Sequence, residues 1–178
     1  MKEKRKWIGI IKCVAFVSFV GLSLACASAP ESVPEVPKTT ITIDDLTVWL
    51  KNQEVSVMTT NELTSKQLME VTKLCISSGE LSDVVIVEEN EVLSYAVLET
   101  RVTVSNVPLS IKFSYSISKN GTLRMRITDV VEINETSPFS RTLNSTDVDT
   151  YKASVIETFS SKLKKIGDTV LSRAADFA

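Results

Sequence analysis

The spacing of apolar residues along the chain predicts a first helix. Apolar side chains recur at steps of three and four over residues 68–75, which is typical of one buried helix face. Thr64 and Gln67 precede this run at the spacing of a capping box, with leucines placed for a hydrophobic staple. Gly79 follows it and is suited to a left-handed cap. The pattern therefore predicts a helix over residues 64–78.

From residue 81 to residue 133 the apolar spacing shifts toward two, as in antiparallel strands with one buried face. Turn residues divide this stretch into four strands. We place these strands at residues 83–88, 91–104, 109–118 and 122–134. The preceding residues 39–59 predict a strand, a short helix that begins at Asp44, and a second strand over residues 54–58.

The turn at residues 119–121, Lys-Asn-Gly, is compatible with two hairpin registers. A two-residue turn would place Tyr115 opposite Arg126, whereas a three-residue loop places Tyr115 opposite Met125. Only the second register gathers apolar side chains on one face, because directly opposed residues point to the same side. We therefore predict the three-residue loop. The polar face of this hairpin would then carry Lys112, Ser114, Ser116, Arg124, Arg126 and Thr128.

A long apolar stripe marks the C-terminal segment. After a cluster of N-cap residues at 144–147, apolar residues recur at steps of three and four from Val148 to Phe177. This pattern predicts a helix of about 30 residues, or roughly 45 Å. A seven-residue spacing also runs from Ile156 to Phe177, so a coiled coil is an alternative to packing on the chain's own sheet, which we favour. Gly167 either kinks this helix or allows close packing.

The N-terminal pattern is typical of an export signal, with four basic residues and one glutamate at 2–6 and an uncharged run over residues 13–24. That run is shorter than the roughly 20 residues that a membrane-spanning helix needs. The next segment, Leu-Ser-Leu-Ala-Cys, resembles the lipobox of bacterial lipoproteins and predicts cleavage before Cys26 and lipidation of its thiol. Cleavage after Ala29 is the alternative, but Pro30 disfavours it because proline lacks an N–H at the scissile bond.

These features predict three segments in the chain. Residues 1–25 form a lipoprotein signal peptide, residues 26–38 form a proline-rich linker that begins at the lipidated Cys26, and residues 39–178 form a single α+β domain. Loss of the signal removes five basic residues and one acid, leaving 15 basic against 21 acidic residues. An acidic chain is a poor ligand for nucleic acid. We therefore expect membrane contact through the lipid anchor alone, at either the inner or the outer membrane.

A family resemblance extends this interpretation. The predicted helix at 64–78, the strand segment SYSISKNGTLRMRITDV and the long C-terminal helix resemble a family of bacterial envelope proteins. Many of these proteins are lipoproteins, and the family is known as a domain of unknown function with a TBP-like fold. The resemblance implies an α+β fold, in which an antiparallel sheet of about five strands carries two helices on one face. It implies no reaction and no catalytic residues.

Few residues of the chain are suited to catalysis or metal binding. The chain has no histidine, the commonest general base and metal ligand. Cys75 is the one thiol left in the predicted domain, and its helical spacing indicates a small core residue. We therefore expect no cofactor and no catalysis, and a binding or scaffolding role beside an envelope protein. One alternative is an enzyme that acts through carboxylates alone, and the other is self-assembly through the C-terminal helix. The candidate carboxylates are Asp44, Asp45, Asp129 and Glu132.

Two surfaces are candidates for binding, although we favour a solvated face and an ordinary connection as the explanations for them. The first is a cationic patch on the polar side of the sheet, where charges would steer a partner more than hold it. We predict that it consists of Arg101, Lys112, Arg124 and Arg126. The second is the long loop at residues 134–144, whose Phe139 and Arg141 are of types common at contact hot spots.

Overall fold

The structure is a computed structural model that describes residues 35–58, 63–90, 95–117, 122–133 and 138–176. Residues Val36–Ala178 form one compact unit. The predicted signal peptide, Cys26 and most of the predicted linker lie outside the described residues.

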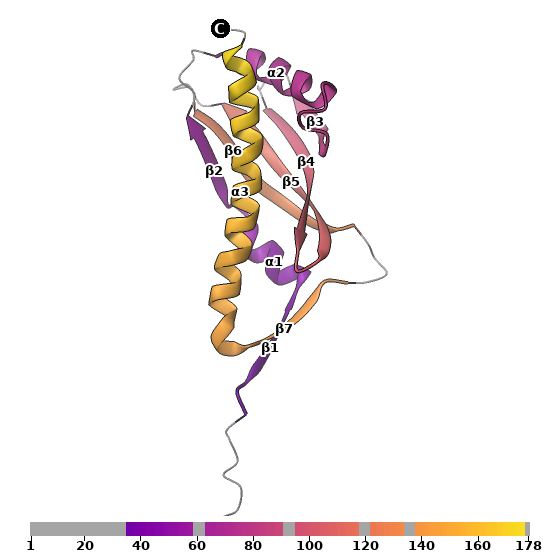
Figure 1. The fold of residues 1–178 in the computed structure, drawn as a ribbon, viewed down its shortest axis with the longest axis vertical. Helices are drawn as coiled ribbons and strands as arrows, with labels where there is room; N and C mark the ends of the chain where they lie inside the picture. The colour runs from indigo at the N-terminus through magenta and orange to yellow at the C-terminus, as the bar shows by residue number, and fades with distance from the viewer. Residues whose placement is uncertain (1–34, 59–62, 91–94, 118–121, 134–137, 177–178) are drawn as a thin grey trace, which may run out of the picture. The chain divides into compact units, whose positions relative to one another are not determined.

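The unit has an α+β fold, as predicted, built on a five-stranded antiparallel sheet (Figure 1). The strands of this sheet follow the order β2-β6-β5-β4-β3, and β1 and β7 form a separate antiparallel pair. The elements in chain order are β1 (Lys38–Thr42), α1 (Ile43–Leu50), β2 (Glu54–Met58), α2 (Ser65–Ser77), β3 (Val84–Asn90), β4 (Tyr95–Val104), β5 (Val107–Ile117), β6 (Thr122–Glu132), β7 (Ser140–Asn144), the 3-10 turn η1 (Ser145–Asp147) and α3 (Val148–Ala175).

The predicted register of the β5–β6 hairpin is confirmed. Tyr115 lies opposite Met125, and Phe113 lies opposite Ile127. The loop that joins the two strands lies outside the described residues. Beyond Phe113 the ladder shifts by one residue, so that Thr128 is an extra residue of β6. Such a bulge bends the strand and increases its twist locally.

The predicted ends of α2 are also confirmed. The Thr64 backbone N–H donates to Gln67 Oε1 at 2.9 Å, and the Gln67 backbone N–H donates to Thr64 Oγ1 at 3.2 Å. This reciprocal pair satisfies two backbone donors that the first helical turn leaves without partners. At the other end Gly79 takes a φ of +85°, the left-handed conformation predicted for it.

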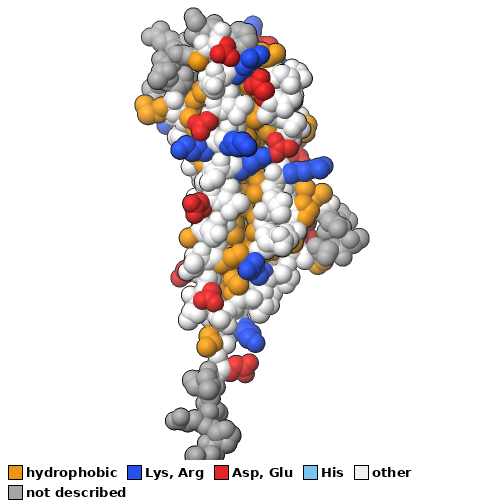
Figure 2. Space-filling view, in the orientation of Figure 1, with side chains coloured by type: hydrophobic (Ala, Val, Ile, Leu, Met, Phe, Trp, Pro, Cys, Tyr) orange, Lys and Arg blue, Asp and Glu red, His pale blue; other side chains and the backbone are white. Residues whose placement is uncertain are grey.

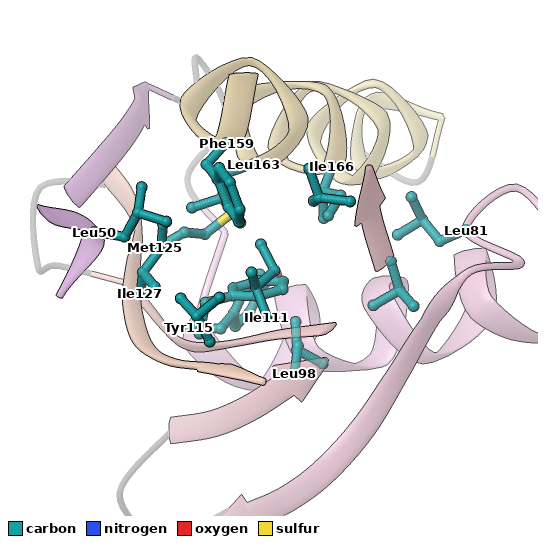
Figure 3. Close-up of a cluster of buried hydrophobic side chains, with 14 of the residues drawn as sticks. Leu50, Leu81, Leu98, Ile111, Tyr115, Met125, Ile127, Phe159, Leu163 and Ile166 are labelled. Carbon is teal, nitrogen blue, oxygen red and sulfur yellow. The ribbon is translucent and has the colours of Figure 1, made fainter. Parts of the chain in front are cut away.

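Three helices, rather than the predicted two, cover one face of the sheet. Helix α3 runs across the sheet, and its side chains Phe159 and Leu163 point toward Met125 of β6 (Figure 3). The apolar stripe of α3 is therefore buried on the chain's own sheet, the packing favoured by the sequence. The additional helix is α1, whose Leu46 and Leu50 are fully buried in the same core.

The segment predicted as a long loop contains a strand. Residues 140–144 form β7, which pairs with β1 from Thr42 opposite Ser140 to Lys38 opposite Asn144. Ile41 of β1 is buried in the core, and Leu143 of β7 packs against that core. The loop prediction was wrong because the partner strand lies about 100 residues earlier, and a local pattern does not reveal such a pairing.

Close packing of α3 depends on Gly167. A Cβ atom at this position would lie 2.8 Å from Met125 Cε and 2.9 Å from Val57 Cγ2. Both distances are well below van der Waals contact, so the helix approaches β2 and β6 closely only because the side chain is absent. Of the two roles predicted for Gly167, close packing is the one observed.

An ion pair joins the same helix to the start of β3. Lys162 of α3 donates to the Asp83 carboxylate, and Thr100 Oγ1 donates to that carboxylate at 3.4 Å. Burial by itself raises the pKa of Asp83, but the hydrogen bond and charge of Lys162 outweigh it. The pKa of Asp83 is therefore lowered from its ordinary 3.8.

We predict that Gly167→Ala destabilises the protein although alanine favours helix formation. The gain of about 1 kcal/mol in helix propensity is outweighed by overpacking against Val57 and Met125, which costs about 1–3 kcal/mol. Urea unfolding measures the difference. Ser161→Ala, on the exposed side of the same helix, is the matched control and should be neutral or stabilising. A Gly167→Ala variant as stable as this control would contradict the packing role.

We predict that Lys162→Met lowers stability at pH 7 by less than about 1 kcal/mol, because the ion pair is partly exposed. A carboxyl with a lowered folded-state pKa stabilises the fold above its unfolded pKa and loses this contribution as pH falls. The difference from the wild type should therefore shrink as pH falls below 3.8 and through the lowered pKa of Asp83. Unfolding curves at pH 7 and at lower pH test this, with Lys164→Met on the exposed side as the control.

Candidate functional site

The face of the five-stranded sheet opposite the helices, here called the outer face, is the candidate site. Along β4 and β5 buried side chains alternate with more exposed ones, and the buried set points toward the helices. No described element covers the outer face. The strand pairings place all four predicted basic residues on it.

The two arginines of β6 already have neighbours within the unit. Arg126 Nη2 donates to Asn52 Oδ1 at 2.6 Å. Asn52 takes a left-handed φ of 74° directly after α1, so Arg126 holds the turn between α1 and β2. Arg124 Nε lies 3.9 Å from Glu54 Oε1 on the neighbouring strand β2. Arg126 therefore has a structural role besides any role in binding.

The other two basic residues lie among acidic and hydroxyl side chains. Lys112 of β5 lies opposite Asp129 of β6 on one side and opposite Glu99 of β4 on the other. Arg101 lies opposite Ser110, and the Ser110 hydroxyl donates to Glu99. Glu99, Lys112 and Asp129 thus form one row across three strands, in which a basic residue lies between two acidic ones.

The outer face is balanced in charge, which corrects the prediction of a cationic patch. Four acidic residues of the described strands share this face with the four basic ones. These acidic residues are Glu54, Glu88, Glu99 and Asp129. The sequence prediction failed because it identified the bases without the acids that strand pairing places beside them. A binding role for this face stays a prediction.

The prediction that Phe139 is a surface contact residue is wrong. Its side chain is only 3% exposed and belongs to the core. Its backbone N–H donates to Glu132 Oε1 at 2.6 Å, which joins the start of β7 to the end of β6. An aromatic side chain in a polar segment was interpreted as a surface anchor, but it fills the core where that segment turns back.

Arg141 is exposed, as predicted, but its contacts are within the unit. It lies on β7, its guanidinium lies 4.8 Å from the centre of the Tyr151 ring, and its Nη1 donates to Ser105 Oγ. The Tyr151 hydroxyl lies 3.0 Å from the same Ser105 oxygen. Trp49 packs edge-on against Tyr151, with ring centres 6.4 Å apart. These contacts attach β7 and the first turn of α3 to the β4–β5 turn.

Sequence reasoning missed this cluster around Tyr151. The available signal was the Ser105-Asn106 pair between two alternating runs, which is typical of a two-residue hairpin turn. The two residues take φ values of 51° and 68°. Left-handed conformations of this kind are strained for serine. The hydrogen bonds of Ser105 to Arg141 and Tyr151 compensate for that strain, so the cluster has a structural explanation.

The buried titratable groups are part of the core. Cys75 is fully buried, and burial, together with the nearby Glu80 carboxylate, raises its pKa to about 11. The thiol therefore stays neutral at pH 7, which agrees with its predicted role as a small core residue. Burial also raises the pKa of Tyr115, whose hydroxyl lies 2.7 Å from Thr72 Oγ1.

The four carboxylates proposed for an enzyme lie at three separate places in the fold. Asp44 and Asp45 lie in the first turn of α1, where Asp45 Oδ2 accepts the Thr42 backbone N–H at 2.8 Å. Asp129 lies on the outer face, and Glu132 accepts the N–H of Phe139. Within the described ranges, no group of three or more histidine, cysteine or acidic residues could hold a metal ion. Among the same residues, no helix is both long enough and apolar enough to cross a bilayer.

Comparison with known proteins finds a similarity to a solved structure. No protein-family model matches the chain, and no curated protein matches its sequence. Among solved structures, the chain is similar to a protein of the DUF4468 family, a domain family of unknown function, from Bacteroides ovatus. The similarity covers 79% of this chain and 91% of that chain, with 7% sequence identity and a TM-score of 0.32.

We predict that Thr72→Val destabilises the protein by about 1–3 kcal/mol, because it leaves the buried Tyr115 hydroxyl without this hydrogen-bond partner. Thr72 Oγ1 also donates to the Leu68 carbonyl at 2.8 Å, so both side chains are fixed in one arrangement. The double variant Thr72→Val/Tyr115→Phe removes both polar groups and should recover part of the loss. A double-mutant cycle from urea unfolding provides the measurement, and additive losses would contradict the coupling.

Proposed function

We propose that the protein is a membrane-anchored bacterial lipoprotein whose α+β domain acts as a non-catalytic binding or scaffolding module of the cell envelope. The observation that carries this proposal is the segment at residues 22–26, Leu-Ser-Leu-Ala-Cys, between an apolar signal and a proline-rich linker. Several acyl chains on one cysteine hold a protein at a bilayer durably, whereas a single chain holds it weakly.

The geometry where the linker enters the domain supports an anchored role. Ser145 binds the Pro37 carbonyl through its backbone N–H at 2.8 Å and through its hydroxyl at 2.9 Å. Strand β1 begins at the next residue, Lys38, and pairs with β7. Pro37 of the predicted linker is therefore bound to the turn η1 directly before α3. In polyproline geometry the residues from Cys26 to Pro37 would reach about 37 Å, which sets the distance the domain can move from its anchor.

We also propose that the domain has a TBP-like fold. The support is the order of its elements, in which β2 and α2 are followed by the meander β3-β4-β5-β6 and then by α3. The first strand of this series pairs with the last, β2 beside β6. Strands β1 and β7 and helix α1 are additions to that arrangement.

The outer face is the surface that we propose for binding. It is the open face of a sheet whose other side lies under three helices, and it alternates charged and hydroxyl side chains. A partner protein in the envelope fits such a surface better than an anionic polymer does, because the positive charges there are matched by acids. Electrostatic recognition would depend on the pattern of charge rather than on its sign.

We predict that Cys26→Ser abolishes lipid attachment and releases the protein from the membrane fraction. The test is expression of the full chain in a bacterium fed with labelled palmitate, followed by fractionation and intact-mass analysis. Cys13→Ser is the matched control, because it changes a cysteine that the signal would carry away. It should leave labelling and fractionation unchanged.

The expected mature wild-type mass is that of a chain beginning at Cys26 with acyl groups attached. A mature chain that begins at Pro30 without an acyl group would contradict the proposal. So would equal labelling of the Cys26→Ser variant and the wild type.

A further inference from the structure

We propose that the outer face is the interface between two copies of this chain. The inference names the partner for the binding surface proposed above. It depends on the binding role of that face and not on the lipid anchor.

Exposed apolar side chains concentrate on the sheet. Of the seven large hydrophobic residues that are exposed in the described part of the chain, five lie in or directly beside the outer-face strands. These five residues are Met58, Val85, Val87, Val131 and Ile133. Pairing places Met58 opposite Thr122, Val85 opposite Glu99 and Val131 opposite Ser110, so these three point away from the helices. Met58 on β2 and Val85 on β3 lie at opposite edges of the sheet, and Val131 lies on β6 between these edges, so apolar contacts with a partner would be spread across the face.

The size of the face suits a dimer. Five strands about 4.8 Å apart give the sheet a width of about 24 Å. The strands have a mean length of about nine residues, which at about 3.3 Å per residue gives a length of about 30 Å. The face therefore measures about 700 Å², close to the roughly 800 Å² that each partner contributes to a standard interface. Two sheets can pack face to face at about 10 Å with their strands nearly aligned.

Charge balance favours a second copy over other occupants. The predicted mature chain has 15 basic and 21 acidic residues, so two copies repel each other over most surfaces. The outer face carries four charged residues of each sign, so two copies that meet through this face have no net charge repulsion between the two faces. A strongly charged partner would leave half of these residues opposite like charges.

The charge pattern also matches itself under a two-fold rotation, as an isologous dimer requires. Arg126 and Asp129 lie on the same strand on either side of the bulge at Thr128. A two-fold axis that runs across the strands at the bulge places Arg126 of one copy opposite Asp129 of the other, and the reverse. The same rotation brings Arg101 near Tyr95 of the other copy, a cation–aromatic pairing.

Among the described residues, two exposed large hydrophobics, Val36 and Val48, lie away from the five-stranded sheet. The apolar stripe of α3 is buried on its own sheet, and basic and acidic side chains lie interspersed over the helix side (Figure 2). A shallow hollow there is lined by side chains of both signs, among them Glu80, Lys165 and Arg173. Association through the C-terminal helix would therefore have to use polar residues, whereas the outer face presents valines.

Site-directed cross-linking in membranes tests the dimer with the full chain. Ser114→Cys places a thiol near the centre of the outer face on β5, and Ser161→Cys places one on the exposed side of α3 as the control. A short bismaleimide linker spans the roughly 10 Å between packed sheets. We expect a product of twice the chain mass from Ser114→Cys and none above the wild-type background from Ser161→Cys.

A second pair of variants tests the apolar contact. Val131→Arg, added to Ser114→Cys, should lower the yield of cross-linked dimer by about tenfold or more, because it buries an unpaired charge in the interface. Val48→Arg, at a valine on α1 that is 75% exposed against 42% for Val131, should leave the yield unchanged. Thermal unfolding of both variants checks that each remains folded.

Three results would overturn the proposal. They are equal dimer yields from Ser114→Cys and Ser161→Cys, absence of a cross-linked product from Ser114→Cys, and a product whose mass shows a different protein. Failure of the lipoprotein proposal would be seen separately, because the chain would then appear in the soluble fraction whether or not it forms the dimer.

Discussion

The fold depends on one constraint, the register of the β5–β6 hairpin. Side chains alternate between the two faces of a strand, so a slip of one residue would exchange the faces of β6 relative to β5. In the observed register Tyr115 and Met125 point to the same side, and the three helices cover that side. The same register assigns Lys112, Arg124, Arg126 and Asp129 to the outer face, whereas Glu132, opposite Leu109, lies on the other side. The core and the candidate binding surface are therefore two consequences of a single pairing.

Local signals predicted the parts of the fold that local physics determines. The capping box at Thr64, the left-handed Gly79 and the hairpin register each follow from residues close together in sequence, and the structure confirms all three. Strand β7 was missed because its partner β1 lies about 100 residues away and neither strand is stable alone. A short helix near Asp44 was predicted, but its packing on the core face as a third helix was not.

The candidate site was less predictable than the fold for a similar reason. A single strand shows which of its residues share a face, but not what the next strand places beside them. Lys112 looked like part of a cationic patch until pairing put Asp129 and Glu99 on either side of it. Phe139 looked like a surface anchor because its neighbours in sequence are polar, whereas the core it fills comes from other elements. The type of a side chain predicts whether it tends to make contacts, and the topology of the fold determines which residues it contacts.

Topology also explains why the outer face is open. Strands β2 and β3 form opposite edges of the sheet, so the connection that contains α2 must cross one face to join them. Helix α3 follows β6, which pairs with β2, and it packs on the same side as α2. With both helices on one side, none of the segments that the structure describes is left to cover the other. An antiparallel sheet tolerates one solvated face, and on this one Val85 and Val131 are exposed among the charged side chains. This combination of an uncovered sheet and apolar residues beside balanced charges is what favours contact with another protein surface over contact with water alone.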